Sequence, residues 1–170
     1  FDMQEAKVEP RVAVFNSAIS ACAKGEQWQS SLELIRYMRW HGFWPDVITF
    51  NAAISGCERG QEWEWALHLL EEMQRSMRDP DVISYSAAIS ACEKGQRWDH
   101  AVRLLGEMQE RSLEPDTIVL SAVISACEKG LQWERALDLL GFMRQASMKQ
   151  DVVVYSAAVS ACAKGRRWEW

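Results

Sequence analysis

Hydrophobic residues recur along the chain at helical spacing, in pairs of stripes separated by a short polar turn. In segment 47–81 the first stripe follows the i, i+3, i+4, i+7 pattern of an amphipathic helix. Its members are Phe50, Ala53, Ile54 and Cys57. The second stripe consists of Trp63, Ala66, Leu67, Leu70 and Met73. Gly60 lies between the stripes, where a left-handed helix C-cap favours glycine, and Pro80 ends the unit. The segment therefore predicts two helices of roughly 12 to 15 residues.

This pattern repeats every 35 residues along the whole chain. All five cysteines obey the period: Cys22, Cys57, Cys92, Cys127 and Cys162. Five of the nine tryptophans do so as well: Trp28, Trp63, Trp98, Trp133 and Trp168. The period also holds for Gly25, Gly60, Gly95, Gly130 and Gly165, and for Met3, Met38, Met73, Met108 and Met143. The four prolines are Pro10, Pro45, Pro80 and Pro115, and Gln150 stands in the next proline position. Repetition at this density indicates a repeat array.

We place the start of each repeat at the residue that follows Pro-Asp. The full repeats are then 12–46, 47–81, 82–116 and 117–151. Residues 1–11 form the second-helix tail of an earlier repeat, and residues 152–170 form a further partial repeat. Because the chain begins at Phe1 and both ends cut through a repeat, we expect a piece of a longer array. Any targeting peptide would then lie outside it.

The predicted fold is all-α. A single helical hairpin cannot bury both of its apolar stripes, so neighbouring hairpins have to stack. The sequence therefore predicts an α-solenoid superhelix of stacked helix-turn-helix hairpins, whose handedness does not follow from the pattern. Short strands at 47–50 and 152–155 are a weaker alternative, because the helical stripe continues through these β-branched residues.

The first helix of each repeat has a second stripe that is small and polar. In three repeats it consists of Ile48, Asn51, Ser55 and Glu58, then Ile83, Ser86, Ser90 and Glu93, then Ile118, Ser121, Ser125 and Glu128. Exposed helix surfaces more often carry Glu, Lys and Gln throughout. Stacked hairpins would place these stripes side by side, so we expect a groove that is kept clear for a ligand.

Composition and charge narrow the functional classes. The net charge of −5 argues against non-specific binding to a polyanion through bulk charge, although a local basic track is compatible with it. No apolar run is long enough to span a bilayer, and an odd number of cysteines prevents complete internal pairing. No nucleophile elbow, phosphate-binding glycine loop or carboxylate constellation stands out. We therefore predict no catalytic residues, cofactor, metal, membrane or small-molecule substrate, although a catalytic domain could lie outside this segment.

Several repeated residues have a simple structural explanation. One Cys per repeat is a small core residue rather than a zinc ligand set. The repeated Trp, next to Ala and Leu at helical spacing, are expected in the core between repeats. The three histidines, His41, His68 and His100, occupy different repeat positions, which argues against a repeated metal or catalytic role. Four tryptophans break the period and could mark a second interaction surface: Trp40, Trp44, Trp65 and Trp170.

The repeat unit resembles pentatricopeptide repeats. The resemblance is carried by the 35-residue length, the opening Val-x-x-Tyr/Phe-Asn/Ser, the Ile-Ser-Ala-Cys-x-Lys-Gly that ends the first helix, the Ala-Leu-x-Leu-Leu-x-x-Met of the second, and the closing Pro-Asp. It covers essentially the whole chain. Tetratricopeptide repeats differ in having 34 residues and a Trp in the first helix, whereas here the Trp opens the second.

The resemblance implies binding of single-stranded RNA, with one base read by each repeat. In this family the fifth and the last residue of a repeat select the base. The pairs are then Asn16 with Asp46, Asn51 with Asp81, Ser86 with Asp116, and Ser121 with Asp151, and Ser156 begins the next. The family code gives a core of 5′-UUGG-3′, with a purine next. The residues that pack between bases would be Ile48, Ile83, Ile118 and Val153, and the first repeat departs with Ala13.

Two of these residue classes have an alternative explanation. An Asp that precedes a helix is often an N-cap, a role compatible with base selection. A cation one residue before the glycine suits the helix dipole but could equally form a phosphate track. The cations in question are Lys24, Arg59, Lys94, Lys129 and Lys164.

The resemblance also implies a role and a compartment. The expected role is RNA processing, stability, editing or translation in an organelle, a chloroplast or a mitochondrion, with the chloroplast slightly favoured. A second hypothesis is a protein-binding scaffold. It is suggested by the acidic net charge, the Glu beside several of the cations, and the surplus of tryptophan.

Overall fold

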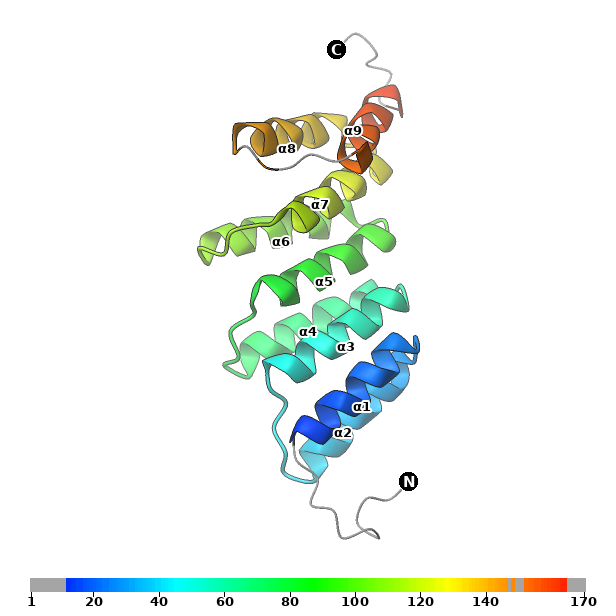
Figure 1. The fold of residues 1–170 in the computed structure, drawn as a ribbon, viewed down its shortest axis with the longest axis vertical. Helices are drawn as coiled ribbons and strands as arrows, with labels where there is room; N and C mark the ends of the chain where they lie inside the picture. Colours follow the sequence, from blue (N-terminus) through cyan, green and yellow to red (C-terminus); the bar gives the residue numbers. More distant parts are fainter. Residues whose placement is uncertain (1–11, 147, 149–151, 165–170) are drawn as a thin grey trace. The chain divides into compact units, whose positions relative to one another are not determined.

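The computed structural model describes residues 12–146, 148 and 152–164. Within these residues the chain forms nine α-helices of 13 residues each, and no strand (Figure 1). The helices are α1 (Val12–Lys24), α2 (Trp28–Trp40), α3 (Val47–Arg59), α4 (Trp63–Arg75), α5 (Val82–Lys94), α6 (Trp98–Glu110), α7 (Thr117–Lys129), α8 (Trp133–Gln145) and α9 (Val152–Lys164). The segments 47–50 and 152–155 lie in α3 and α9, so the strand alternative is wrong.

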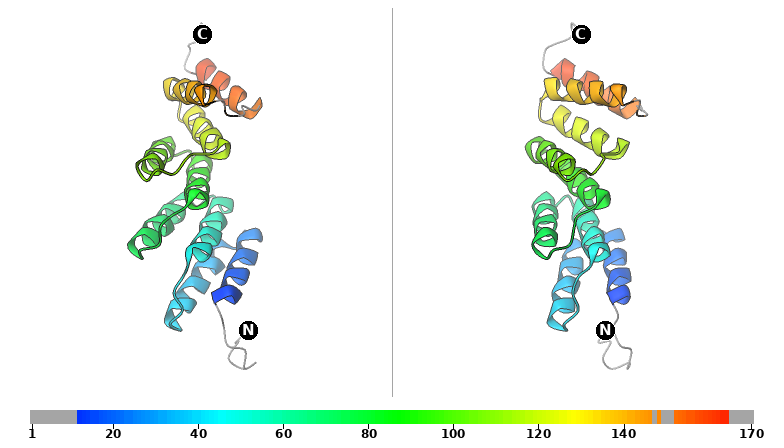
Figure 2. Two further views of the ribbon diagram at one scale, coloured as in Figure 1. Left: turned by 60° about the vertical axis from the view of Figure 1, so that its left-hand side comes forward. Right: turned by 90° about the vertical axis from the view of Figure 1, so that its left-hand side faces the viewer.

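The chain divides into two compact units, Phe1–Pro80 and Asp81–Trp170. In the first unit, α1 and α2 form one hairpin, α3 and α4 form the next, and α3 packs against both α1 and α2. In the second unit, α5 pairs with α6 and α7 with α8, while α7 also packs against α5 and α9 (Figure 2). The predicted all-α arrangement of stacked hairpins is therefore confirmed within each unit.

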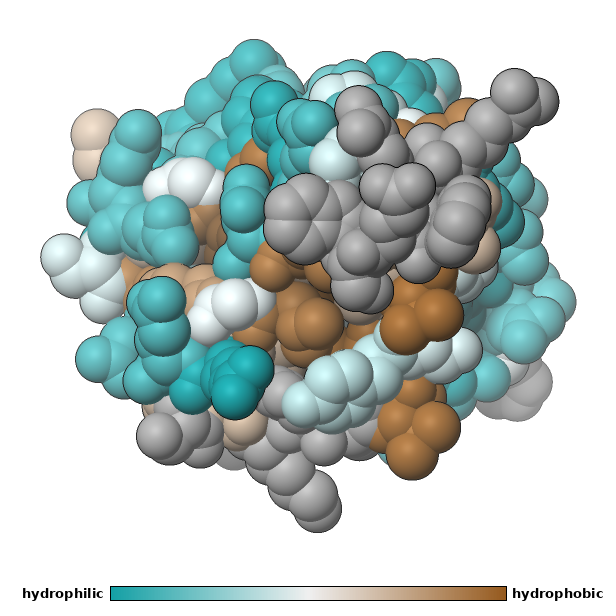
Figure 3. Space-filling model, turned by 90° about the horizontal axis from the view of Figure 1, so that it is seen from above, coloured by the Kyte–Doolittle hydropathy of each residue, from teal (hydrophilic) through white to brown (hydrophobic). Residues whose placement is uncertain are grey.

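Stacking buries the apolar stripes. Leu120 and Ile124 in α7, which lies between α5 and α9, are fully buried. At the same repeat positions in α9, Tyr155 and Val159 are 48% and 67% exposed. Figure 3, a view onto this end of the second unit, shows hydrophobic patches among hydrophilic residues. A first helix that packs against only one neighbouring hairpin therefore leaves apolar surface in contact with water, which is the physical reason for the array.

The turn inside each hairpin differs from the sequence prediction. Gly60 is the C-cap of α3 but has a φ of −74°, so the left-handed assignment was wrong. The left-handed residue is the next one, Gln61, with a φ of 59°. The N–H of Glu62 donates to the carbonyl of Cys57 at 2.9 Å, the closing bond of a Schellman turn. The residues equivalent to Gln61 in the other hairpins, Glu26, Gln96 and Leu131, also have positive φ.

The repeated glycine is required instead by a tryptophan of the preceding hairpin. A Cβ on Gly130 would lie 2.5 Å from Cγ and 2.9 Å from Cβ of Trp98. A Cβ on Gly60 would lie 3.1 Å from Cγ and Nε1 of Trp28. Both glycines have negative φ, so the constraint is the space that the indole occupies and not the backbone conformation. The Trp and the Gly therefore form one joint between successive repeats.

This joint can be tested by adding a single methyl group. We expect Gly130→Ala to lower the free energy of unfolding by about 1–3 kcal/mol, because the indole of Trp98 has to move. Gly106 is a matched control inside α6, since a Cβ there meets nothing within 4 Å. Gly106→Ala should instead raise the unfolding free energy by about 0.5–1 kcal/mol. Urea denaturation measures both, and equal effects would reject the joint.

Candidate functional site

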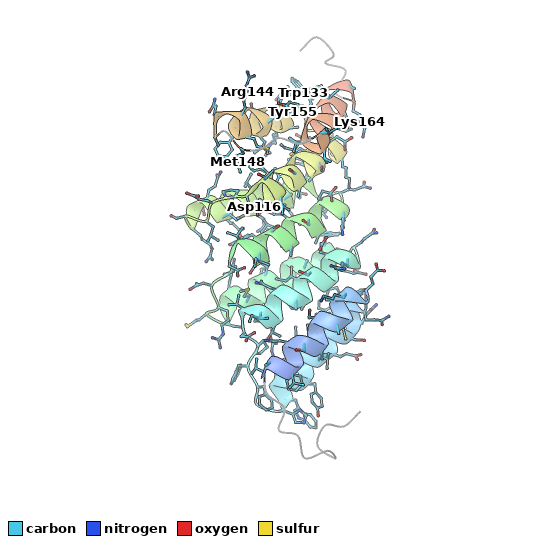
Figure 4. All side chains as sticks on the ribbon, in the orientation of Figure 1. Asp116, Trp133, Arg144, Met148, Tyr155 and Lys164 are labelled. Carbon is cyan, nitrogen blue, oxygen red and sulfur yellow. The ribbon has the colours of Figure 1, made fainter. Side chains whose placement is uncertain are left out.

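The predicted base-selecting aspartates lie at the N-termini of the first helices. Asp46, Asp81 and Asp116 are the N-caps of α3, α5 and α7. Their carboxylates accept hydrogen bonds from the N–H groups of Thr49, Ser84 and Val119, at 2.8–2.9 Å. The capping role that the sequence left open is therefore confirmed for these three. Asp151 lies outside the described residues. Figure 4 shows Asp116 at the start of α7.

In the first unit, Asp46 also brings the first predicted base-selecting pair together. Nδ2 of Asn16 donates to the two carboxylate oxygens of Asp46 at 3.1 and 3.2 Å. The hydroxyl of Thr49 lies 2.5 Å from Oδ1 of Asn16 and 2.8 Å from the Asp46 carboxylate, and it accepts the N–H of Asp46. Both ends of the Asn16 amide are thereby oriented. Asp81 and Ser84 form the same kind of capping box in the second unit.

Thr49 and Ser84 are site residues that the sequence analysis missed. A hydroxyl residue three positions after the Asp is the pattern of a reciprocal cap, and it could have been found at 46–49 and 81–84. At the third Asp the same position holds Val119, which provides only its backbone N–H. The third cap therefore lacks the hydroxyl partner that the other two have.

The hydrogen bonds also determine the ionisation of Asp46. Partial burial disfavours the charged carboxylate. The bonds from the N–H and hydroxyl of Thr49 and from the amide of Asn16 outweigh this and hold the pKa of Asp46 below its ordinary value. The carboxylate therefore stays ionised through the neutral pH range, and its stabilising effect is lost only as the pH falls through that lowered pKa.

The other predicted selecting residues lie on the same helices. Asn51, Ser86 and Ser121 are half-buried, and Ser156 is exposed. The Ser121 hydroxyl donates to the carbonyl of Thr117 at 2.6 Å, within its own helix. The residues predicted to pack between bases are unusually exposed aliphatics, between 60% and 65% exposed: Ile48, Ile83, Ile118 and Val153. Ala13, in that position of α1, is also exposed.

The predicted phosphate-binding cations lie at the opposite, C-terminal ends of these helices, and all five are exposed. Figure 4 shows Lys164 at the end of α9. In the second unit, Nζ of Lys129 lies 2.6 Å from the carboxylate of Glu93, and Nζ of Lys164 lies 2.5 Å from that of Glu128. Each lysine therefore pairs with a glutamate of the preceding repeat, a contact that the sequence analysis did not predict.

The five cysteines differ in how deeply they are buried. Cys57, Cys92 and Cys127 are fully buried, as predicted, and burial raises the pKa of their thiols to about 12, 12 and 11. Such thiols stay protonated and unreactive at neutral pH. Cys22 and Cys162 are only half-buried, which corrects the prediction for these two. Among the described residues, no group of three His, Cys, Asp or Glu side chains could hold a metal ion.

Four of the repeated tryptophans are half-buried rather than in a closed core: Trp28, Trp63, Trp98 and Trp133. Trp168 lies outside the described residues. For two of them, Trp28 and Trp98, a residue of the next repeat lies against the ring. Trp65 packs on Trp28 with ring centroids 6.4 Å apart, and Arg135 lies 5.1 Å above the ring of Trp98. Trp65 and Arg135 occupy equivalent positions, so the joint explains Trp65, which the period left unexplained.

Two of the irregular tryptophans face solvent in the first unit. Trp40 and Trp44 are 84% and 73% exposed, and Trp170 lies outside the described residues. The equivalents of Trp40 in later repeats are Arg75, Glu110 and Gln145. Trp44 borders a hollow of about 250 Å³ that is lined by Arg39, Trp44, Pro45, Glu72, Ser76 and Arg78. Within that hollow, Arg39 forms an ion pair with Glu72.

The N-cap predicts a pH-dependent stability. At neutral pH, Asp46→Ala should lower the free energy of unfolding by about 1 kcal/mol, through loss of the cap. The folded-state pKa of Asp46 is lowered, so its contribution is present above the unfolded-state value of about 3.9 and is lost below it. Urea denaturation should show the difference from the parent chain shrinking below about pH 4. Asp79→Ala, an exposed acid outside the cap, is the control, and a pH-independent difference would contradict the assignment.

Several solved structures have a fold similar to that of this chain. Solved structures of similar fold include the pentatricopeptide repeat protein PPR10 from maize, with 23% identity and a TM-score of 0.83 over 98% of this chain and 24% of that one. The same protein in complex with an 18-nt psaJ RNA element gives 24% identity and a TM-score of 0.77, with the same coverage. The chain thus spans about a quarter of the length of PPR10.

A third structure is the PPR domain of Arabidopsis thaliana protein-only RNase P 1 in complex with tRNA. It is 14% identical, with a TM-score of 0.80 over 94% of this chain and 84% of that one. The stacked helical hairpins of this chain thus have the fold of known PPR α-solenoids. No curated protein sequence matches the chain, and no described helix is long and apolar enough to cross a membrane.

Two protein-family models match the sequence. The PPR repeat family matches residues 45–94 and 80–129, and the PPR repeat matches residues 13–43 and 118–148. Together these matches cover most of the sequence and confirm the family resemblance that its motifs indicate. The chain belongs to the PPR repeat family.

Proposed function

We propose that this chain binds single-stranded RNA with sequence specificity, one base per repeat, as part of a longer array. The observation that carries the proposal is the Asn16–Asp46–Thr49 network beside an exposed aliphatic, Ile48. A side chain held in one orientation by neighbouring groups can distinguish hydrogen-bond donors from acceptors on a ligand. A freely rotating amide would accept either arrangement.

The Asn16 amide keeps capacity to bind a base. Its Nδ2 carries two hydrogens, and its Oδ1 accepts two hydrogen bonds. Asp46 and Thr49 occupy part of this capacity, so at least one lone pair is left over for a Watson–Crick edge. Ser at the same position is shorter and leaves room for a larger base. Exposed Ile48 would pack against the face of a base at little desolvation cost.

The base assignment follows the pairs of each repeat. Asn with Asp in the first two repeats favours uracil, and Ser with Asp in the next two favours a purine, which we assign as guanine. The proposed core is 5′-UUGG-3′, with Ser156 favouring a further purine. The repeat boundaries 12–46, 47–81, 82–116 and 117–151 are part of the same proposal.

The relatives support RNA as the partner. PPR10 was solved with an 18-nt psaJ RNA element, and the PPR domain of protein-only RNase P 1 was solved with tRNA. We propose a binding role without catalysis for this segment. The RNase P relatives are compatible with a catalytic domain elsewhere in a longer protein. By family habit we place the protein in an organelle, a chloroplast or a mitochondrion, where it would act in RNA processing, stability, editing or translation.

Binding by the isolated segment should be weak. Base stacking contributes about 1–3 kcal/mol per base, so four repeats provide roughly 4–12 kcal/mol. Association costs an estimated ~4–15 kcal/mol. The net charge of −5 adds little long-range attraction to phosphates. Binding assays therefore need low salt and high protein concentration.

The base assignment is tested by changing one selecting residue. We expect Asn51→Thr to shift the preference at the second base from uracil towards guanine, because a hydroxyl replaces the amide that fits uracil. Selection from a randomised single-stranded RNA pool measures the preference at every position.

The matched control is the same substitution in the preceding repeat. Asn16→Thr should change the first base and leave the second as uracil. If both variants keep the parent preference, the pairing of these residues with bases is wrong. If the parent chain selects no sequence, the proposal of sequence-specific binding fails.

A protein-binding scaffold is the second candidate, and one surface favours it. Trp40 and Trp44 are 84% and 73% exposed in the first unit, although residues at the position of Trp40 elsewhere are charged or polar. Exposed tryptophans are typical of the central contacts in protein interfaces. This surface involves none of the proposed base-selecting residues, so the two functions are compatible.

The two candidates are separated by substituting this surface. Trp40→Ala with Trp44→Ala should leave the sequence preference for RNA unchanged, because neither residue belongs to the selecting pairs. If the scaffold function exists, the double variant should lose proteins that co-purify with the chain after ribonuclease treatment. Gln145→Ala, at the exposed position equivalent to Trp40, is the control. Retention of all partners by the double variant would remove the evidence for a scaffold.

A further inference from the structure

Two lysines of the proposed phosphate track, Lys129 and Lys164, form ion pairs with glutamates. Lys129 pairs with Glu93 at 2.6 Å and also donates to the Glu93 backbone carbonyl at 3.3 Å. Lys164 pairs with Glu128 at 2.5 Å. Each bond joins the end of one first helix to the end of the preceding one. We call these contacts the inter-repeat ion pairs.

We propose that Glu93 and Glu128 limit the affinity of the chain for RNA by competing with phosphates for Lys129 and Lys164. This inference rests on the proposed RNA-binding function. A phosphate that takes either lysine leaves a glutamate carboxylate beside the RNA backbone. The repulsion between these two anions offsets the new contact, so each ion pair adds little net attraction.

The location of the pairs supports this competition. Glu128 belongs to the small polar stripe that also contains Ser121. Its carboxylate accepts a 2.7 Å hydrogen bond from Ser160, a stripe residue of the next repeat. Lys129 follows Ser121 by eight residues, about 12 Å along the helix. The ion pairs therefore lie on the proposed RNA-binding face, at the end away from the N-caps.

The side chains of the glutamates are less exposed than those of the lysines. The side chains of Glu93 and Glu128 are 20% and 16% exposed, against 36% and 49% for Lys129 and Lys164. Hydrogen bonds from Lys164 and Ser160 keep the pKa of Glu128 below its ordinary value, so the carboxylate is charged at neutral pH. The more exposed lysine ends can reach a phosphate, whereas the less exposed carboxylates lie beside the proposed path of the RNA backbone.

The first unit differs at the same position. Arg59 ends α3, and the residue 36 positions before it, the spacing of both ion pairs, is Ala23. Alanine provides no carboxylate to neutralise Arg59. The proposal therefore predicts that phosphate contacts are unequal along the chain, stronger at Arg59 than at Lys129 and Lys164.

The experiment removes the two carboxylates and measures the salt dependence of RNA binding. The 170-residue chain with Glu93→Gln and Glu128→Gln is titrated with a labelled single-stranded RNA containing UUGG, by fluorescence anisotropy. Each freed lysine should make the slope of log K against log salt more negative by about 0.7. The two together should steepen it by about 1.4 and raise affinity roughly 5-fold per lysine near 0.1 M salt.

A matched control has the same change of formal charge in the same unit. Glu134→Gln with Asp138→Asn removes two exposed carboxylates of α8 that take part in neither ion pair. Equal slopes for the control and the test variant would overturn the proposal, because only bulk charge would then matter. Circular dichroism verifies that both variants fold, which is expected because exposed ion pairs stabilise a fold only weakly. The single variant Glu93→Gln, with half the slope change, provides a second measurement.

The outcomes separate this inference from the proposed function. If the parent chain binds RNA and the test variant matches the control, only the ion-pair proposal fails. If the parent chain and all variants fail to bind RNA even at low salt, the proposed function and this inference fail together. A steeper slope for the test variant alone supports both.

Discussion

A helical hairpin of this chain carries apolar stripes on both helices, and pairing the two helices covers only part of them. The next hairpin covers the rest, as the contrast between buried Leu120 in α7 and half-exposed Tyr155 in α9 shows. Every other feature of the repeat follows from this need. Within each unit, successive hairpins meet through equivalent positions, so the same residue is required at the same position, which accounts for the 35-residue period.

The joints between hairpins show how specific this requirement is. The indole of Trp98 occupies the space where a side chain on Gly130 would lie, and Arg135 lies over the same ring. In the first unit, Trp28, Gly60 and Trp65 make the corresponding joint. The high tryptophan content of the chain is therefore largely a consequence of repetition, and the exposed Trp40 and Trp44 are the residues that need a separate explanation.

The N-caps connect stability to the proposed function. Asp46 accepts a hydrogen bond from the first turn of α3 and, with Thr49, orients the Asn16 amide of α1, the first helix of the preceding repeat. One carboxylate thus caps the start of a helix and orients the side chain that we propose to select a base, so the two roles are compatible in one residue. At the opposite end of the helices, the inter-repeat ion pairs combine two charges of opposite sign on the same face.

The helices, their period and the residues of the buried stripes could be predicted from residue spacing, because helical periodicity and a repeated stacking contact both act at fixed intervals along the chain. The spacing also placed the exposed aliphatics such as Ile48 apart from the core stripe. The reason for glycine at position 60 could not be predicted in this way, since the indole that excludes a side chain there comes from another hairpin. The same holds for the pairing of Lys129 with Glu93, 36 residues away, because a contact between repeats depends on how helices are stacked and not on any local pattern.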